Sequence, residues 1–391
     1  MDLVTRMQRH GTTIFTEISA LAQRHGAINL GQGFPDTDGP TEVLAAAKQA
    51  IDEGSNQYPP LDGRPELLEA IASHQRRWYG IDLDPARQVL VTVGATEAIA
   101  ATILAFCSPG DEVVMFEPYY DSYAAVVDLA GAVRRTVVLR FPDFDVDEAA
   151  LRAAFSPRTR LVLLNSPHNP TGKVFTTAEL TLIADLARQH DAWVVTDEVY
   201  EHLTYDRPHV PISTLPGMAE RTLTISSAGK TFSVTGWKVG WLSGPAAAVA
   251  AVRTVKQFLT FAAGGPFQLA AAIGLALPDS YYADLRDGLR AKRDLLVDAL
   301  DRAGLRSSVP EGTYFVVADV SPLGIADAVG FARELPSRLG VAAIPVQSFH
   351  DDPDAGRTLL RFAFCKRDDV LRGAARRLAG LTSGQSRLPP R

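Results

Sequence analysis

Cysteine is scarce in this sequence: Cys107 and Cys365 are the only two among 391 residues. Two thiols are too few for a disulfide framework or a cysteine-based zinc site, and such sparse usage suits a reducing cytoplasm. The eight histidines are scattered, and the closest pair, His202 and His209, has a spacing of seven that fits no common ligand motif. We therefore expect no metal centre and a cytoplasmic protein.

Long runs of charge and long uninterrupted apolar runs are also missing. The formal net charge is −6, which argues against nucleic acid or an anionic membrane as a partner. The first residues carry charges but lack the apolar core of a signal peptide. Phe258 to Leu277 is uncharged over a span-like length, but Gly264-Gly265-Pro266 interrupts it. We expect two buried, alanine-rich pieces that meet at a tight turn there, not a membrane span.

What the sequence does contain is a regular alternation of short apolar strands and helical patterns. Composition is globular, with 46% apolar and 21% charged residues, and the length predicts more than one domain. Several strands are apolar at consecutive positions, as expected in a parallel sheet buried on both faces. The pattern predicts an α/β fold with strands at 89–93, 112–116, 135–139, 160–165, 192–197, 221–225 and 238–243.

After Pro278 the pattern of apolar and charged residues changes to one that predicts a smaller α+β unit. A long charged amphipathic helix is expected near 279–303, followed by a helix near 327–339. The remaining apolar runs predict strands at 313–319, 340–345 and 358–364. In the first part of the chain, helices are expected at 96–106 and 177–189, the second preceded by Thr176 with Glu179 three residues later.

Ligands of open α/β sheets bind at the carboxyl ends of the strands, so these ends are where chemistry is expected. Gly94-Ala95-Thr96 starts a helix directly after a strand, which is typical of a phosphate site. Tyr120 follows the next strand and offers a face for stacking. Asn165 and Asn169 lie in a loop held rigid by prolines.

Two further strand ends carry an acid and an amine. Asp197 ends a fully apolar strand, where a carboxylate needs a polar or charged partner, and Tyr200 follows it. Lys230 follows RTLTISSAG, and Lys238 could lower its pKa or hold a phosphate beside Ser227. Each feature alone has an ordinary explanation: a plain turn, core packing, a helix N-cap at Asp197 or a solvated lysine.

The features occur together, and together they fit one cofactor. Pyridoxal phosphate needs a lysine for a Schiff base, an acid on its pyridinium nitrogen, donors to its phenolate oxygen and an anchor for its phosphate. The successive strand ends of this sequence offer all four. The sequence therefore predicts a pyridoxal-phosphate enzyme.

The chain resembles the fold type I, class I/II aminotransferases over nearly its full length. The likeness rests on seven segments in the family's order, which are NLGQGFPD (29–36), NQYPPLDG (56–63), VTVGATEA (91–98), NSPHNPTGKV (165–174), TDEVYEHL (196–203), SSAGKTFSVTGWKVGW (226–241) and LLRFAFCK (359–366). The resemblance implies a large domain (46–280) with a mostly parallel seven-stranded sheet, and a smaller α+β domain (1–45 and 281–391) with an N-terminal arm. It also implies a homodimer with shared active sites.

The family pattern, carried onto this sequence, implies roles toward the cofactor. Lys230 is expected to form the Schiff base and to move the proton during catalysis. Asp197 is expected to pair with the pyridinium nitrogen, and Asn169 and Tyr200 with the phenolate oxygen. The other implied contacts are stacking by Tyr120 and a phosphate site made of Ala95, Thr96, Ser227 and Lys238, joined by Tyr58 from the partner subunit.

The same pattern implies a substrate site. Arg361 is expected to clamp the substrate α-carboxylate as a bidentate pair, helped by Asn169 and the backbone near Gly33. Phe15 and, from the other subunit, Phe261 match aromatic residues that line the substrate pocket.

Different segments of the sequence resemble aminotransferases for different substrates. NLGQGFPD and FCKRDD are similar to the succinyl-diaminopimelate aminotransferases, whereas the lysine segment is similar to the kynurenine/glutamine aminotransferase and cysteine-conjugate β-lyase group. That group has a histidine after the aromatic matching Phe261, where this chain has Ala262. The resemblance favours an aminotransferase for N-succinyl-LL-diaminopimelate and 2-oxoglutarate. The alternatives are a kynurenine-, glutamine- or methionine-type aminotransferase, or a lyase that eliminates from Cβ or Cγ.

An alternative from a different functional class is a regulatory protein that binds the cofactor but has no catalytic activity. It would need a DNA-binding segment, and neither end of the sequence carries a basic helix-turn-helix pattern.

Overall fold

The computed structural model describes residues 4–8, 10–11, 13–352 and 354–382. Its centre is a seven-stranded sheet in the order β2-β8-β7-β6-β5-β3-β4. Strand β8 is antiparallel to both neighbours, and the other adjacent pairs are parallel. The strands are β2 (Val89–Val93), β3 (Glu112–Glu117), β4 (Val133–Val138), β5 (Thr159–Asn165), β6 (Trp193–Asp197), β7 (Thr222–Ser227) and β8 (Val239–Ser243). The predicted mostly parallel sheet of seven strands is confirmed.

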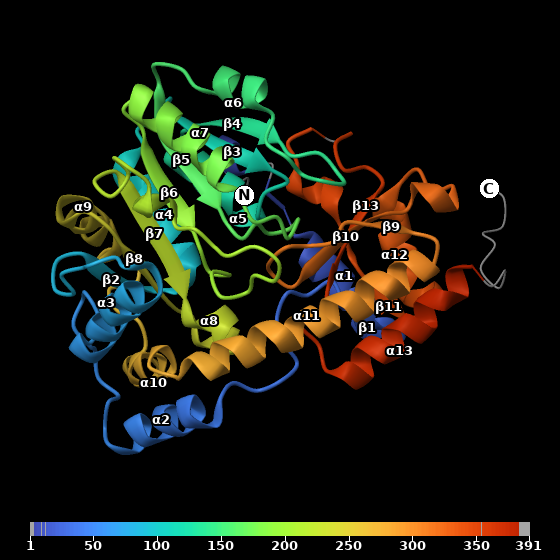
Figure 1. Cartoon of the computed structure of the whole chain (residues 1–391), viewed down its shortest axis with the longest axis horizontal. Helices are drawn as coiled ribbons and strands as arrows, with labels where there is room; N and C mark the ends of the chain where they lie inside the picture. Colours follow the sequence, from blue (N-terminus) through green and yellow to red (C-terminus); the bar gives the residue numbers. More distant parts are fainter. Residues whose placement is uncertain (1–3, 9, 12, 353, 383–391) are drawn as a thin grey trace.

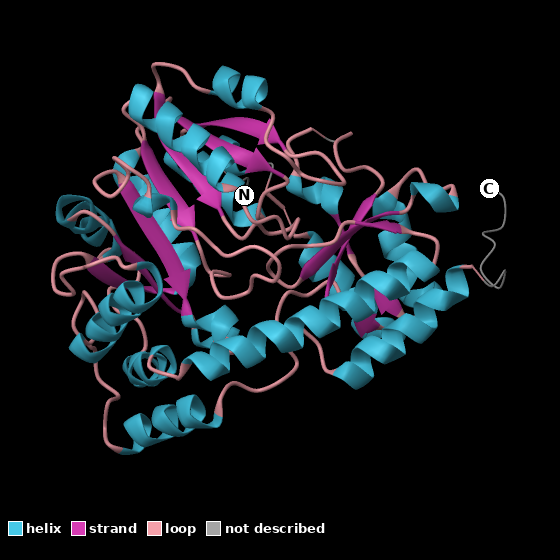
Figure 2. Cartoon of the chain, viewed as in Figure 1, coloured by secondary structure: helices cyan, strands magenta, loops and turns pink. Residues whose placement is uncertain are grey.

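Helices cover both faces of this sheet (Figure 2). Every residue of β3, β7 and β8 is buried, as expected for strands covered on both faces. One face packs against α4 (Gly94–Phe106), α5 (Asp121–Ala130) and α9 (Ala246–Lys256). The other face packs against α7 (Thr177–Gln189) along part of the sheet, and against α3 (Pro65–Tyr79) and α10 (Gly265–Leu275) along the rest.

Helix α7 begins where the sequence predicted. The backbone N–H of Glu179 donates to Thr176 Oγ1 at 3.1 Å, and the Thr176 N–H donates to Glu179 Oε2 at 2.8 Å. This reciprocal capping satisfies two N–H groups that the helix leaves without partners, and an N-cap of this kind is worth about 1 kcal/mol.

The smaller unit is built on an antiparallel sheet in the order β12-β13-β10-β9. Helix α11 runs from the large sheet's side to this unit, as Figure 1 shows: Tyr282 packs beside α3 and α10, and Leu296 and Leu300 pack with the small sheet. The elements of this unit are β9 (Arg306–Ser307), β10 (Phe315–Asp319), β12 (Ile344–Pro345), β13 (Leu359–Ala363), α1 (Ile14–His25), α11 (Asp279–Arg302), α12 (Ala328–Arg338), α13 (Asp368–Leu378) and the pair β1 (Ile28–Asn29) with β11 (Val341–Ala342).

One predicted strand is wrong: residues 340–345 do not form a single strand. β11 pairs in parallel with β1, whereas β12 pairs with β13, so the chain changes partners at Ala343. The remaining helices are α2 (Thr41–Asp52), α6 (Glu148–Ala154), α8 (Ala228–Thr231) and the short 3₁₀ turns Thr5–Met7, Ile212–Thr214, Thr235–Trp237, Ser321–Leu323, Val346–Phe349 and Ala379–Leu381.

The expectation for Phe258 to Leu277 is half right. α10 starts at Gly265 with Pro266 in its first turn and packs against α2 and α3. The residues before it form turns and loop, and most of them are not buried: Phe258 is 81% and Leu259 48% exposed, whereas Ala263 is buried. Among the described residues, no helix is long and apolar enough to cross a membrane.

The topology brings the chemically interesting strand ends to one edge. Asn165 at the end of β5 lies opposite Asp197 at the end of β6, and β7 continues the same parallel set. β2 ends at Val93 opposite Val239, the first residue of antiparallel β8, so Gly94 and Lys238 meet at that edge as well. The carboxyl edge of the sheet is therefore where a ligand site is expected.

Candidate active site

A cavity of about 450 Å³ lies at this edge. Twelve of the fourteen site residues predicted from the sequence line it. They are Phe15, Gly33, Ala95, Thr96, Tyr120, Asn169, Asp197, Tyr200, Ser227, Lys230, Lys238 and Arg361.

Asp197 is buried at the end of β6 and lines this cavity. Its Oδ2 accepts a hydrogen bond from the Tyr123 hydroxyl at 2.6 Å, and its Oδ1 accepts one from the Val199 N–H at 3.3 Å. Burial raises the pKa of Asp197 to about 6, although the hydrogen bond from Tyr123 acts in the opposite direction and lowers this pKa. A turn and not a helix follows, so the alternative reading of Asp197 as a helix N-cap is wrong.

Lys230 lies in the single-turn helix α8, directly after β7. Burial lowers its pKa to about 8, and the positive charges of Arg361 and Lys238 act in the same direction, whereas Asp197 opposes them. The Nζ lies 5.8 Å from the Tyr200 ring centroid. A substantial fraction of the amine is therefore neutral near pH 8, which is the state that a nucleophilic lysine needs.

The N-terminus of α4 and the side chain of Lys238 converge at one end of the cavity. Gly94 has φ +72°, and a Cβ there would lie 3.1 Å from Lys238 Nζ. A Cβ on Gly240 would overlap the backbone of Gly94 and Ala95, so both glycines permit β8 to approach the start of the helix. Helix N–H groups and an ammonium at one point form an anion site.

Arg361 lies on β13 and is 2% exposed. Its Nη1 donates to Asn169 Oδ1 at 2.9 Å and its Nη2 to the Gly31 carbonyl at 2.8 Å. Nε is buried and has no hydrogen-bond partner within the described residues. The guanidinium lies 4.0 Å from the Phe315 ring centroid and 5.1 Å from that of Phe15. Its two acceptors are neutral, so this buried cation can still pair with a carboxylate.

The backbone around Asn169 and Gly33 is held by hydrogen bonds. Asn165 Oδ1 accepts from the Asn169 N–H at 2.7 Å, and Asn165 Nδ2 donates to the Asp197 carbonyl at 2.8 Å. The Tyr314 hydroxyl donates to the Gly33 carbonyl at 2.5 Å, and a Cβ on Gly33 would collide with the Phe315 ring. These contacts fix the floor of the cavity between the large and small units.

Tyr58 and Phe261 are the two predicted site residues that do not line the cavity. Their side chains are 83% and 44% exposed, and their rings meet edge to face with centroids 5.6 Å apart. The sequence pattern assigned both to the active site of a partner subunit, and that assignment stays a prediction.

Several residues of the cavity were missed by the sequence analysis. Tyr123, which binds Asp197, has one available signal: it lies one helical turn after Tyr120 at the start of α5. Asn165 was noted in its loop but was given no role. Further lining residues that were given no role include Thr13, Gln32, Phe34, Asp121 and Phe315.

The residues present fit pyridoxal phosphate: one cavity joins an anion site, a buried carboxylate, an amine of lowered pKa and an aromatic ring. The family model for class I and II aminotransferases matches residues 25–378. The chain belongs to this family, which confirms the resemblance and the fold. It is a pyridoxal-phosphate-dependent enzyme that transfers an amino group between an amino acid and a 2-oxo acid.

Individual relatives extend over nearly the whole chain. The chain is 52% identical to the probable N-succinyldiaminopimelate aminotransferase DapC of Mycobacterium tuberculosis, covering 97% of this chain and 98% of that protein. It is 43% identical to the methionine aminotransferase of Escherichia coli, covering 96% and 98%. The solved structure of N-succinyldiaminopimelate aminotransferase from Mycobacterium tuberculosis matches with a TM-score of 0.95 over 97% of this chain and 100% of that chain.

Proposed function

We propose that this aminotransferase interconverts N-succinyl-LL-diaminopimelate and its 2-oxo acid, with 2-oxoglutarate and glutamate as the second pair. The observation that carries the proposal is the 52% identity, end to end, to a relative named for this substrate. It is the substrate that the NLGQGFPD and FCKRDD segments also favour.

The cavity is compatible with a long substrate. Its described lining includes three cations, Lys230, Lys238 and Arg361. Lys230 and Lys238 are accounted for by the cofactor, so Arg361 is left for one substrate carboxylate. A short dicarboxylate such as aspartate needs a second cation at close range. Phe15 and Phe34 give the remaining wall apolar character, which suits the methylene chain of an extended amino acid.

Methionine is a second candidate, because of the 43% identity to a methionine aminotransferase and the same apolar wall. The test is a comparison of kcat/KM for N-succinyl-LL-diaminopimelate, methionine, glutamine and kynurenine, each with 2-oxoglutarate. We expect the succinylated substrate to have the highest value. A value well below that of any other donor would reject this substrate and leave the aminotransferase activity standing.

For the cofactor, we propose that Lys230 holds it covalently and moves the proton at the substrate Cα. The lowered pKa of Lys230 supports this role. Asp197 pairs with the ring nitrogen, which lets the cofactor act as an electron sink. Asn169 and Tyr200 bind the phenolate oxygen, and Tyr120 stacks on the ring. The phosphate site consists of Ala95, Thr96, Ser227 and Lys238, supported by the convergence of the α4 N-terminus with Lys238.

For the substrate, we propose that Arg361 binds the α-carboxylate. Its support is the buried Nε without an acceptor and the two neutral acceptors, Asn169 Oδ1 and the Gly31 carbonyl, that its Nη atoms contact within the described residues. Asn169 orients the guanidinium from one side, the backbone near Gly33 closes the other, and Phe15 borders the side-chain pocket.

We further propose a homodimer in which Tyr58 and Phe261 complete the partner's site. Lys256 Nζ donates to the carbonyls of Leu61 and Phe261 at 2.7 and 2.6 Å, so one buried ammonium holds the two segments together. Phe258, 81% exposed beside them, adds apolar surface that a subunit contact would cover.

Subunit exchange tests the dimer. If Tyr58→Phe is itself severely impaired, mixing it with inactive Lys230→Ala enzyme should restore part of the activity, because one hybrid site then has both native residues. A fully active monomer in light scattering would reject the shared site.

The domain limits and location also remain proposals: residues 46–280 as the large domain, and 1–45 with 281–391 as the small one. The limit at residue 46 falls inside α2. Val43 and Ala47 of this helix pack against Ala270, which supports placing the whole helix with the large domain. A cytoplasmic location is supported by the two cysteines, which are both free and buried.

A further inference from the structure

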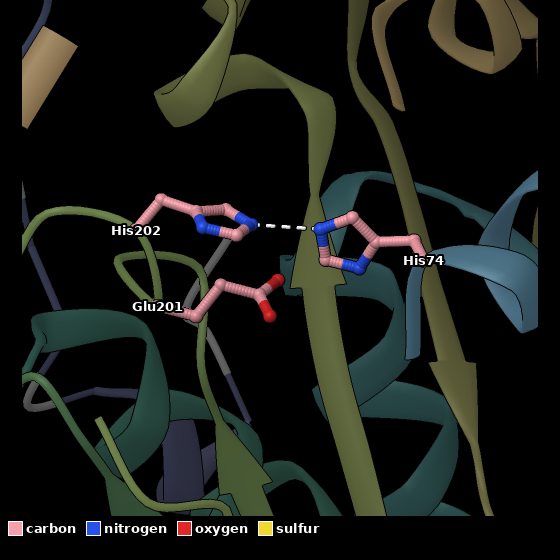
Figure 3. Close-up of side chains that lie close together, drawn as sticks. All are labelled: His74, Glu201 and His202. Atoms are coloured by element: carbon pink, nitrogen blue, oxygen red, sulfur yellow. Dashed lines mark hydrogen bonds between the residues drawn. The ribbon is translucent and has the colours of Figure 1, made fainter. Parts of the chain in front are cut away.

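Three potential metal ligands meet outside the active-site cavity. His74 lies on α3, and Glu201 and His202 lie in the turn after β6. His74 Nε2 and His202 Nε2 are 2.7 Å apart, and one ligand atom from each of the three residues lies within 4.8 Å of the others. Figure 3 shows a nitrogen of each imidazole ring directed at the other ring, with the Glu201 carboxylate beside them.

This cluster is on the opposite side of the sheet from the catalytic cavity. Ser227 of β7 lines the cavity, whereas its neighbour Ser226 donates from Oγ to Glu201 Oε1 at 2.7 Å. Successive strand residues point to opposite faces, so Glu201 lies behind the sheet. None of the three residues lines the cavity, and no proposed step of amino transfer uses them.

The chemistry of the set matches a transition-metal site. Two imidazoles and one carboxylate form a donor set known from zinc enzymes, which leaves a fourth position for water.

Glu201 supplies the carboxylate of the cluster. Its Oε1 accepts a hydrogen bond from Ser226, which orients the carboxylate as a supporting hydrogen bond orients a metal ligand. Its Oε2 is buried, and the Tyr79 hydroxyl interacts with the same carboxylate.

The geometry requires a small adjustment. A tetrahedral ion with bonds of about 2.1 Å holds its ligand atoms about 3.4 Å apart, so the two imidazole nitrogens, which lie 2.7 Å apart, must separate by about 0.7 Å. His202 is half-buried, so its ring is not fully enclosed by the protein. Trp78 and Tyr282, with ring centroids 4.8 and 4.4 Å from that of His202, shield the position from bulk water.

We propose that His74, Glu201 and His202 bind one divalent transition-metal ion, with zinc as the best match, and that water completes its coordination. The bound ion fastens α3 to the turn that carries Tyr200, the residue before Glu201. This goes against the expectation from sequence spacing that the chain has no metal centre.

The test uses the holoenzyme, with Zn²⁺ followed by calorimetry and Co²⁺ by its visible d–d absorption. We expect one saturable ion per chain and a rise in Tm with Zn²⁺. His74→Gln, Glu201→Gln and His202→Gln should each weaken affinity more than about 100-fold, since even loss of a supporting residue costs 10- to 100-fold. His25→Gln, at an exposed histidine that ends α1, is the matched control and should bind as wild type.

Two outcomes would overturn the site. No saturable binding by the wild-type protein would leave the histidines as a neutral hydrogen-bonded pair. Equal binding by wild type and His202→Gln would place the ion elsewhere, including on the cofactor. If the buried variants fail to fold, Ser226→Ala serves instead: a 10- to 100-fold weaker affinity supports the site, and an unchanged affinity removes Glu201 from it.

Discussion

Replacing Arg361 by lysine tests how the cavity holds a substrate carboxylate. Arg361 is buried and its planar guanidinium is fixed by Asn169 and the Gly31 carbonyl. A lysine keeps the positive charge but loses the planar fork, so it can offer a carboxylate one well-aligned hydrogen bond where arginine offers two.

The loss can be estimated from one such bond. A hydrogen bond to a charged group contributes about 1.5–3 kcal/mol, and tenfold in affinity corresponds to about 1.4 kcal/mol. KM should therefore rise about 10- to 150-fold. The increase should be similar for every amino donor and for the 2-oxo acids, because all share the α-carboxylate. The value of kcat should fall much less, since the interaction exists before and during the reaction.

Steady-state kinetics with methionine, glutamine and the succinylated donor measure this effect. Arg302→Lys, at a largely exposed arginine paired with Asp298 on α11, is the control and should leave KM unchanged. Circular dichroism melting confirms that Arg361→Lys is folded. An unchanged KM for all donors, or an increase confined to one donor, would refute carboxylate binding by Arg361.

The other predictions concern the cofactor end. Lys230→Ala should abolish transamination, whereas Lys238→Ala should mainly weaken cofactor retention; the reverse result would show that the wrong lysine was chosen. The pKa of Lys230 is lowered to about 8, so covalent uptake of pyridoxal phosphate by apoprotein should accelerate with pH and level off above about 8, not above the ordinary value of 10.5. Asp197→Ala should still bind cofactor but lose most of kcat, and a change in KM alone would contradict its role. Tyr123→Phe removes a hydrogen bond that stabilises ionised Asp197, so the acid limb of the kcat/KM profile should move to higher pH; an unmoved limb would show that Tyr123 has no such effect.

Much of the site could be predicted because strand ends can be recognised locally. Asp197 follows an apolar run, and Lys230 follows another. In a parallel sheet the carboxyl ends of such strands must meet at one edge. The register of β5 with β6, which puts Asn165 opposite Asp197, follows from that arrangement. Local pattern and sheet topology together were sufficient for these residues.

Contacts between the large and small units could not be predicted in the same way. Arg361 and Asn169 are 192 positions apart, and no periodicity in either segment indicates that they touch. Likewise, the break at Ala343 depends on which strands are available to β11 and β12. The Arg361–Asn169 contact and the break at Ala343 both depend on tertiary packing. Only the family resemblance indicated that Arg361 and Asn169 belong to one site.

In the turn after β6, the roles of some residues could be predicted from the sequence and the contacts of others could not. Within TDEVYEHL, Asp197 and Tyr200 line the cofactor cavity, while Glu201 and His202 meet His74 behind the sheet. Asp197 and Tyr200 could be predicted as site residues because they are polar residues at the carboxyl end of an apolar strand. The second pair depends on α3, whose His74 lies 128 positions from His202, so the spacing of neighbouring histidines could not reveal it. Tyr200 and Glu201 are consecutive, so the turn after β6 presents one side chain to the cofactor cavity and the next to the cluster with His74.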